Sequence, residues 1–237
     1  ALALLVSGGH TELVLIKKLG KYKIIGETID DAAGEAFDKV ARILNLPYPG
    51  GPEISKLAEM FRSKNYESRI MNKEVGLTKI KLPRPMIHSK DFNFSFSGLK
   101  TAVLYLVRDL TKVTKHTQFN DNRCPETEKG NILDIGCRAA IAKEFQDAVV
   151  EVLLAKTISA AKIFKIKTVI LGGGVAANKL LRKKLSGAIR NNLSLVTCYM
   201  SHGSVTGDNA LMIALAAAVT GKKKSASKIK AESNLTF

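Results

Sequence analysis

The chain alternates between short apolar runs and longer stretches in which apolar residues recur every three or four positions. Short runs bounded by glycine, proline or polar residues predict β-strands, and here they fall at residues 3–6, 12–16, 22–29, 91–96, 168–171 and 193–199. Because short turns join the first three runs, we expect an antiparallel meander at the start of the chain.

The longer stretches predict helices, which fall at residues 30–44, 54–61, 99–110, 137–164, 179–189 and 210–219. In the first of them Phe37, Val40 and Leu44 form an apolar stripe, and Asp30 or Asp31 is the expected N-cap. A meander followed by helices and strands in alternation predicts an α/β fold.

Glycine turns follow two of the predicted strands. The turn Ser7-Gly8-Gly9 offers backbone N–H groups and a hydroxyl that could hold phosphate oxygens. The turn Gly172-Gly-Gly174 lacks Cβ atoms, so its backbone could lie flat against a ligand. Each turn taken alone also fits an ordinary connection, whereas the pair in this order indicates a nucleotide site. A turn rich in proline and glycine at residues 47–52 would bring Gly51 close to Asp38 if it folds back.

Composition narrows the class of partner. Hydrophobic residues make up 46% of the 237 residues, which is enough for a well-formed core. The net charge of +16 favours an anionic partner such as nucleic acid, although a basic surface can also serve solubility alone. Candidate phosphate contacts, which could equally be solvated faces, are Lys79, Lys81, Arg84, Lys90 and the run Lys222 to Lys224.

Cysteine usage and hydropathy bear on the compartment. Three cysteines without a Cys-x-x-Cys pair predict a reducing environment, with neither a disulfide framework nor a zinc site. The longest apolar run, near residues 210–219, is too short to span a bilayer. No signal-peptide pattern opens the chain. We therefore expect a cytoplasmic protein without membrane association.

Six ordered motifs carry a resemblance to a known family. They are Leu5-Val-Ser-Gly-Gly-His-Thr11, Asp31-Ala-Ala-Gly-Glu-Ala-Phe-Asp-Lys39, Tyr48-Pro-Gly-Gly-Pro52, Phe94-Ser-Phe-Ser-Gly-Leu-Lys100, Gly172-Gly-Gly-Val-Ala-Ala-Asn178 and Gly207-Asp-Asn-Ala210. With these motifs the chain, up to about Val219, resembles the TsaD family of tRNA threonylcarbamoyltransferases. Within this family the chain resembles the bacterial or organellar branch most, because His10 follows the glycine pair.

The resemblance implies an actin-like nucleotide-binding fold. Residues 1–221 would form a largely complete C-terminal lobe with a helical insertion at about 52–135, and residues 222–237 would form a disordered basic tail. The family's His-x-x-x-His metal pair lies upstream of the phosphate turn and is absent here, which implies that most of the N-terminal lobe is missing. We therefore expect the 237-residue chain alone to be inactive.

The resemblance also implies an activity and partners. The family transfers a threonylcarbamoyl group from threonylcarbamoyl-AMP to N6 of the adenosine adjacent to the anticodon, in tRNAs that read codons beginning with A. It implies one divalent metal ion, iron or zinc, and subunits similar to TsaB and TsaE. The location would be cytoplasmic, or mitochondrial for an organellar member. The alternatives are a non-catalytic scaffold paralogue and a sugar or acetate kinase of the same superfamily, and an upstream His-x-x-x-His pair would exclude both.

The family's site positions fall on particular residues of this sequence. The resemblance places Asp38 and Gly51 at the ribose and Asn178 at the adenine, and at the phosphate it places Leu5, Val6, Ser7, Gly8 and Gly9. Asp208 is the implied metal ligand, and no catalytic residue is assigned. An intrahelical salt bridge is the alternative for Asp38, and a helix N-cap is the alternative for Asp208. Some relatives carry an acidic residue where Ser55 stands, so a ligand contact there stays open.

Overall fold

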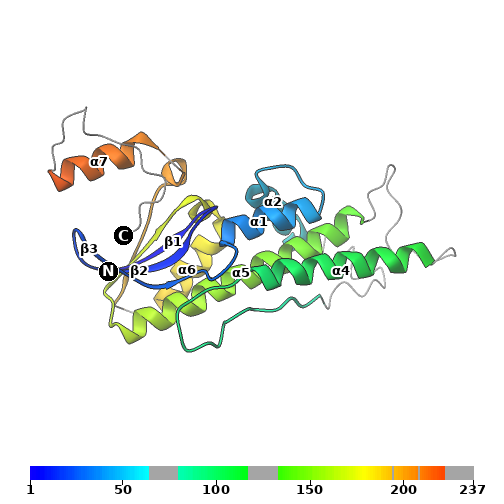
Figure 1. The fold of residues 1–237 in the computed structure, drawn as a ribbon, viewed down its shortest axis with the longest axis horizontal. Helices are drawn as coiled ribbons and strands as arrows, with labels where there is room; N and C mark the ends of the chain where they lie inside the picture. The colour runs from blue at the N-terminus through cyan, green and yellow to red at the C-terminus, as the bar shows by residue number, and fades with distance from the viewer. Residues whose placement is uncertain (64–79, 117–132, 194, 208, 222–237) are drawn as a thin grey trace.

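A mixed sheet organises the part of the chain that the computed structural model describes, which is residues 1–63, 80–116, 133–193, 195–207 and 209–221. The strand order is β3-β2-β1-β4-β5 (Figure 1). The strands are β1 (Leu2–Val6), β2 (Thr11–Lys18), β3 (Lys21–Glu27), β4 (Thr168–Gly172) and β5 (Thr197–Met200). The predicted meander is confirmed, since β1, β2 and β3 pair antiparallel.

Strand β1 is the centre of the sheet. It pairs with β2 on one side and, in parallel, with β4 on the other, with Leu4 opposite Leu13 and Leu171. Leu2, Leu4 and Val6 are fully buried, which explains why β1 reads as a continuous apolar run. Strand β5 continues the parallel half beside β4.

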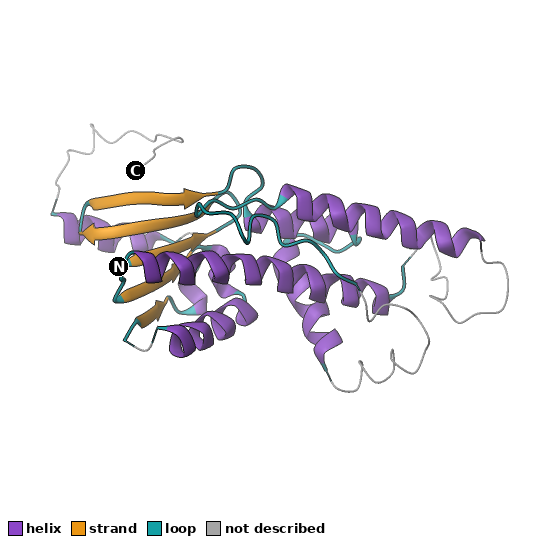
Figure 2. Cartoon of the chain, turned by 90° about the horizontal axis from the view of Figure 1, so that it is seen from below, coloured by secondary structure: helices purple, strands orange, loops and turns teal. Residues whose placement is uncertain are grey.

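The helices of the described residues are α1 (Ala33–Ile43), α2 (Gly50–Arg62), α4 (Ser97–His116), α5 (Ile135–Ile163), α6 (Lys179–Asn192) and α7 (Ala210–Thr220). Short 3-10 turns, η2 (Gly174–Ala177) and η3 (Gly203–Val205), follow β4 and β5. The longest helix, α5, passes along the sheet and continues into a helical half where it packs on α2 and α4 (Figures 1 and 2). The predicted apolar stripe of the first helix is confirmed, because Phe37, Val40 and Leu44 are buried.

The strand predicted at residues 91–96 is wrong. Phe94 makes only an isolated bridge to Thr28. The Phe94 and Phe96 rings are fully buried, and the Asp30 carboxylate accepts the backbone N–H of Phe96 at 2.8 Å. The sequence alternates because these rings pack into the core. The Phe94 backbone bonds to Glu27 and Ile29, but the Asp30 side chain satisfies Phe96, so the pairing does not extend into a strand.

The predicted acidic N-cap of the first helix is also wrong. The N-cap position of α1 is Ala32, which makes no side-chain cap. The Thr11 hydroxyl of β2 accepts the Ala33 N–H at 2.8 Å and takes over part of that role. Asp31 instead lies 2.6 Å from the Lys39 ammonium. The sequence pattern could not show this because Thr11 comes from a distant strand.

Smaller differences concern the later elements. Strand β5 begins at Thr197 and not at residue 193, because α6 runs on to Asn192. Cys137 is disulfide-bonded, although the cysteine pattern predicted a reducing environment without a disulfide framework, whereas Cys198 is a free thiol. Within the described ranges, no helix is long and apolar enough to cross a membrane. The predicted basic tail and much of the predicted insertion lie outside the described residues.

Candidate functional site

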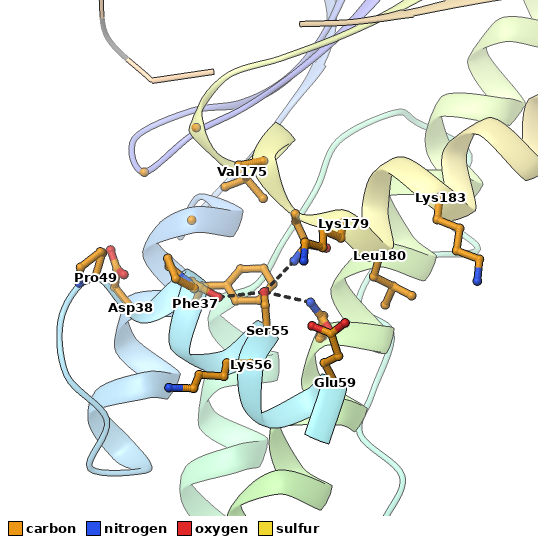
Figure 3. A pocket seen from close by; sticks show the side chains of 18 of the residues that line it. Phe37, Asp38, Pro49, Ser55, Lys56, Glu59, Val175, Lys179, Leu180 and Lys183 are labelled. Carbon is orange, nitrogen blue, oxygen red and sulfur yellow. Dashed lines mark hydrogen bonds between the residues drawn. The ribbon is translucent and has the colours of Figure 1, made fainter. Parts of the chain in front are cut away.

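A cavity of about 730 Å³ opens where β1 and β4 end. Helices α1 and α2 form one wall, and η2 with the start of α6 forms the other (Figure 3). Gly8 follows β1, and Gly174 follows β4, so the cavity lies at the carboxyl ends of two parallel strands. In α/β proteins this is the usual place for a ligand.

The first glycine turn touches the start of α1, and the second touches the end of β1. Gly173 has φ of 89°, and a Cβ there would meet the Val6 carbonyl oxygen at 2.3 Å. A Cβ on Gly34 would meet the Ser7 carbonyl oxygen at 2.5 Å. The same carbonyl accepts the Gly34 N–H at 3.1 Å. Glycine is therefore required because three backbone segments converge beside the cavity.

The Ser7 side chain organises the first glycine turn. Its Oγ accepts the N–H groups of His10 at 3.0 Å and Gly9 at 3.3 Å. Two of the N–H groups that could hold a phosphate are thus occupied within the turn. Gly8 is the residue of this turn that lines the cavity, whereas Leu5, Val6, Ser7 and Gly9 lie in the adjoining strand and turn without lining it.

Asp38 and the turn rich in proline and glycine meet as predicted. The Asp38 Oδ1 accepts the Gly50 N–H at 2.7 Å, across the junction between α1 and α2. A Cβ on Gly50 would lie 2.4 Å from the Ala41 methyl group, so glycine permits this close return. Asp38 and Gly51 both line the cavity. A carboxylate has further acceptor capacity, so Asp38 can also receive ligand hydroxyls.

Ser55 lies at the centre of a hydrogen-bond cluster on the cavity wall (Figure 3). Its Oγ accepts the side-chain amides of Gln146 at 3.0 Å and Asn178 at 3.1 Å, and donates to the Gly51 carbonyl at 2.9 Å. Asn178 is also the N-cap of α6, because its Oδ1 accepts the Leu181 N–H at 3.0 Å. These contacts connect α2, α5 and α6.

Charged side chains surround the outer part of the cavity, with Lys56, Glu59, Lys179 and Lys183 on its rim. Beneath them Asp147 of α5 lies 2.9 Å from Arg62, 3.2 Å from Lys143 and 3.3 Å from Lys184. Burial raises the pKa of Asp147, but the charges of Arg62, Lys184 and Lys143 outweigh it and hold that pKa below its usual value. The region therefore stays cationic, with the ionised Asp147 carboxylate embedded beneath the rim.

The structure therefore brings together four of the sequence-predicted residues, namely Gly8, Asp38, Gly51 and Asn178. Asp208, the predicted metal ligand, lies outside the described residues. Within the described ranges no cluster of three His, Cys, Asp or Glu residues could hold a metal ion.

Sequence reasoning missed Gln146, which is only 2% exposed. The sequence held no clear signal for it, because the charged residues Glu144 and Asp147 stand beside it in the same helix and are buried as well.

One predicted phosphate contact has another role. The Arg84 guanidinium donates to Glu151 at 2.8 Å and also pairs with Glu144, so it ties residues 80–90 to α5. Lys81 and Lys90 are exposed, whereas Lys79 and the run Lys222 to Lys224 lie outside the described residues.

These features define a class of protein: an α/β chain whose ligand-sized cavity lies between two glycine turns at the carboxyl ends of parallel strands. A family model described as "TsaD: tRNA N6-adenosine threonylcarbamoyltransferase" matches residues 1–215. The chain belongs to this family.

Individual relatives agree with that assignment. The tRNA N6-adenosine threonylcarbamoyltransferase of Thermosipho africanus is 45% identical over 91% of this chain and 54% of its own length. The protein of the same name from Bordetella avium is 43% identical over 91% of this chain and 53% of its own. The chain thus spans about half the length of the curated relatives that it matches. The chain is also weakly similar to a crystal structure of T. kodakarensis HypF, with a TM-score of 0.45 and 18% identity over 81% of this chain and 21% of that one.

Proposed function

We propose that this chain is the substrate-binding lobe of a tRNA N6-adenosine threonylcarbamoyltransferase. The cavity would bind threonylcarbamoyl-AMP, and the acceptor would be the adenosine adjacent to the anticodon of tRNAs that read codons beginning with A. The observation that carries the proposal is the convergence of Asp38, Gly51 and Asn178 with both glycine turns around one cavity. Family membership and relatives of that name support it.

The proposed reaction is a direct acyl transfer. The N6 amine of adenosine attacks the carbamoyl carbonyl carbon, the bond from that carbon to the phosphate oxygen breaks, and AMP leaves while the amine loses a proton. Asp38 would accept ribose hydroxyls and Asn178 would bind the base. The cationic rim with Lys56, Lys179 and Lys183 would favour the phosphate and the incoming tRNA. The contribution of these residues is binding and orientation of the adenylate.

The family resemblance also suggests a divalent metal, iron or zinc, with Asp208 as one ligand. The described residues hold no cluster that fits a metal ion, so we derive no reaction step through one. Further ligands would have to come from residues outside the described ranges. An actin-like arrangement of the two lobes, subunits similar to TsaB and TsaE and a cytoplasmic location belong to the same proposal.

The proposal is tested by nucleotide binding to the complete gene product. Asp38→Ala should weaken the calorimetric affinity for AMP by about 1–3 kcal/mol, or about 5- to 150-fold, because a buried hydroxyl contact is lost. Asp109→Ala is the matched control, since Asp109 is an exposed aspartate on α4 far along the chain. An unchanged affinity of the Asp38 variant would remove Asp38 from the site.

A further inference from the structure

Two side-chain amides beside the cavity have orientations that the structure fixes from both ends. The Gln146 Oε1 accepts from the Arg62 guanidinium at 2.9 Å, and a guanidinium can only donate. The Gln146 Nε2 must therefore face the other way, where it donates to the Ser55 Oγ at 3.0 Å. The direction of this amide therefore follows from the charge of Arg62.

The Asn178 amide is fixed by the same logic. Its Oδ1 accepts the Leu181 N–H at the start of α6, and a backbone N–H can only donate. Its Nδ2 must then face Ser55, to which it donates at 3.1 Å. One N–H and one oxygen lone pair of Asn178 remain for a ligand, in a single orientation.

The hydrogen bonds donated by Gln146 and by Asn178 meet at the Ser55 hydroxyl (Figure 3). A serine hydroxyl can accept two hydrogen bonds and donate one. Ser55 accepts from Gln146 and Asn178 and donates to the Gly51 carbonyl at 2.9 Å, so its capacity is filled within the protein. It has no hydrogen bond left for a ligand, although it lines the cavity.

We propose that Ser55, held by Gln146 and Arg62, is a positioning residue that locks the Asn178 amide and so determines which purine the cavity accepts. The inference rests on the proposed function, in which Asn178 meets the base. At its six-position edge adenine offers an N6 donor beside a ring acceptor. Hypoxanthine offers an O6 acceptor there and an N1–H donor, which is the inverted pattern. An amide held at both ends presents one fixed pattern to the base. An amide held only by the Leu181 N–H keeps its direction but loses its fixed position, so the matching base loses the most affinity.

The experiment compares AMP with IMP on the complete gene product. Calorimetry of the unmodified protein should show at least about tenfold tighter binding of AMP, as expected for one fixed bidentate contact. Ser55→Ala should reduce that ratio by about fivefold or more, mainly by weakening AMP, because Nδ2 of Asn178 loses its acceptor. Ser55→Thr keeps a hydroxyl and should restore the ratio, which a role in packing alone would not produce. Ser63→Ala, at the far end of α2, is the matched control.

A second variant covers the case in which Ser55→Ala does not fold. Gln146→Leu keeps the side-chain size, removes one of the two donors to Ser55 and should lower the AMP to IMP ratio in the same direction. If the unmodified protein binds neither nucleotide, the proposed function fails and this inference fails with it. If it prefers AMP but the Ser55 and Gln146 variants keep the full ratio, the inference alone is overturned.

Discussion

At the scale of single residues, the cavity depends on backbone positions that leave no room for a side chain. Gly173 combines a positive φ of 89° with a carbonyl oxygen 2.3 Å from where a Cβ would stand. Its neighbour Gly174 has nothing within 4 Å of the corresponding position. The turn therefore requires glycine at position 173, whereas position 174 has room for a side chain.

This difference gives a prediction about stability. Gly173→Ala should destabilise the protein by about 1–3 kcal/mol or more, because the turn must shift away from Val6 and adopt a strained φ. Gly174→Ala, the matched control, should change stability by less than about 0.5 kcal/mol. Urea unfolding followed by circular dichroism measures both. Equal losses in the two variants would contradict the assignment of the strain to Gly173.

At the scale of elements, Asp30 fixes the start of α4 to the end of the meander. Its carboxylate accepts the N–H of Phe96 at 2.8 Å and of Ser97 at 3.3 Å, and the hydroxyls of Ser95 and Ser97, both at 2.6 Å. Because α4 begins at Ser97, a negative charge lies at the positive end of that helix. An aspartate predicted to cap one helix thus stabilises the start of another.

The pKa of Asp30 gives this contact a pH dependence. Burial raises the pKa, but the hydrogen bonds from Ser95, Ser97 and Phe96 outweigh it, so the pKa lies below its ordinary value of 3.8. A lowered folded-state pKa contributes stability above the unfolded value, and that contribution is lost as the pH falls through the folded value.

We therefore expect Asp30→Ala to lower the free energy of unfolding by about 1 kcal/mol at pH 7. The loss is modest for a helix cap because Asp30 is exposed. The difference from the unmodified protein should shrink as the pH falls below 3.8. Denaturant titrations between pH 7 and pH 3 measure it, with exposed Asp109→Ala as the control. A difference that stays constant over this range would show that the charge of Asp30 does not contribute.

At the scale of the whole molecule, charge and apolar surface are unevenly distributed. Between Glu151 and Asp208 the sequence has no acidic residue, and this stretch includes the cavity wall with Lys179 and Lys183. Helix α7 is apolar yet exposed, with Ile213 at 64%, and it stands apart from the sheet (Figure 1). A surface of this kind is typical of a contact with another protein segment.

Under the proposed function, the basic surface predicts how the affinity for tRNA depends on salt concentration. The logarithm of the affinity should fall linearly with the logarithm of salt concentration, by about 0.7–0.9 for each phosphate contact. Lys81→Ala and Lys90→Ala should each make that salt dependence shallower by the slope of one phosphate contact, about 0.7–0.9. Arg84→Ala should leave the slope unchanged, because its guanidinium is paired with Glu144 and Glu151. Fluorescence anisotropy at several salt concentrations measures the slopes, and a slope near zero would exclude this surface as the tRNA contact.

The sequence by itself determined the meander, the buried stripe of α1 and the two glycine turns, because local spacing and glycine placement encode them directly. It also indicated Asp38, Gly51 and Asn178 through their motifs. Only the tertiary structure decided that Thr11 replaces an acidic cap, that residues 91–96 form no strand and that Ser55 joins Gln146 to Asn178. Each of these depends on contacts between residues far apart in the chain, and a single sequence carries no direct signal of which distant partners meet.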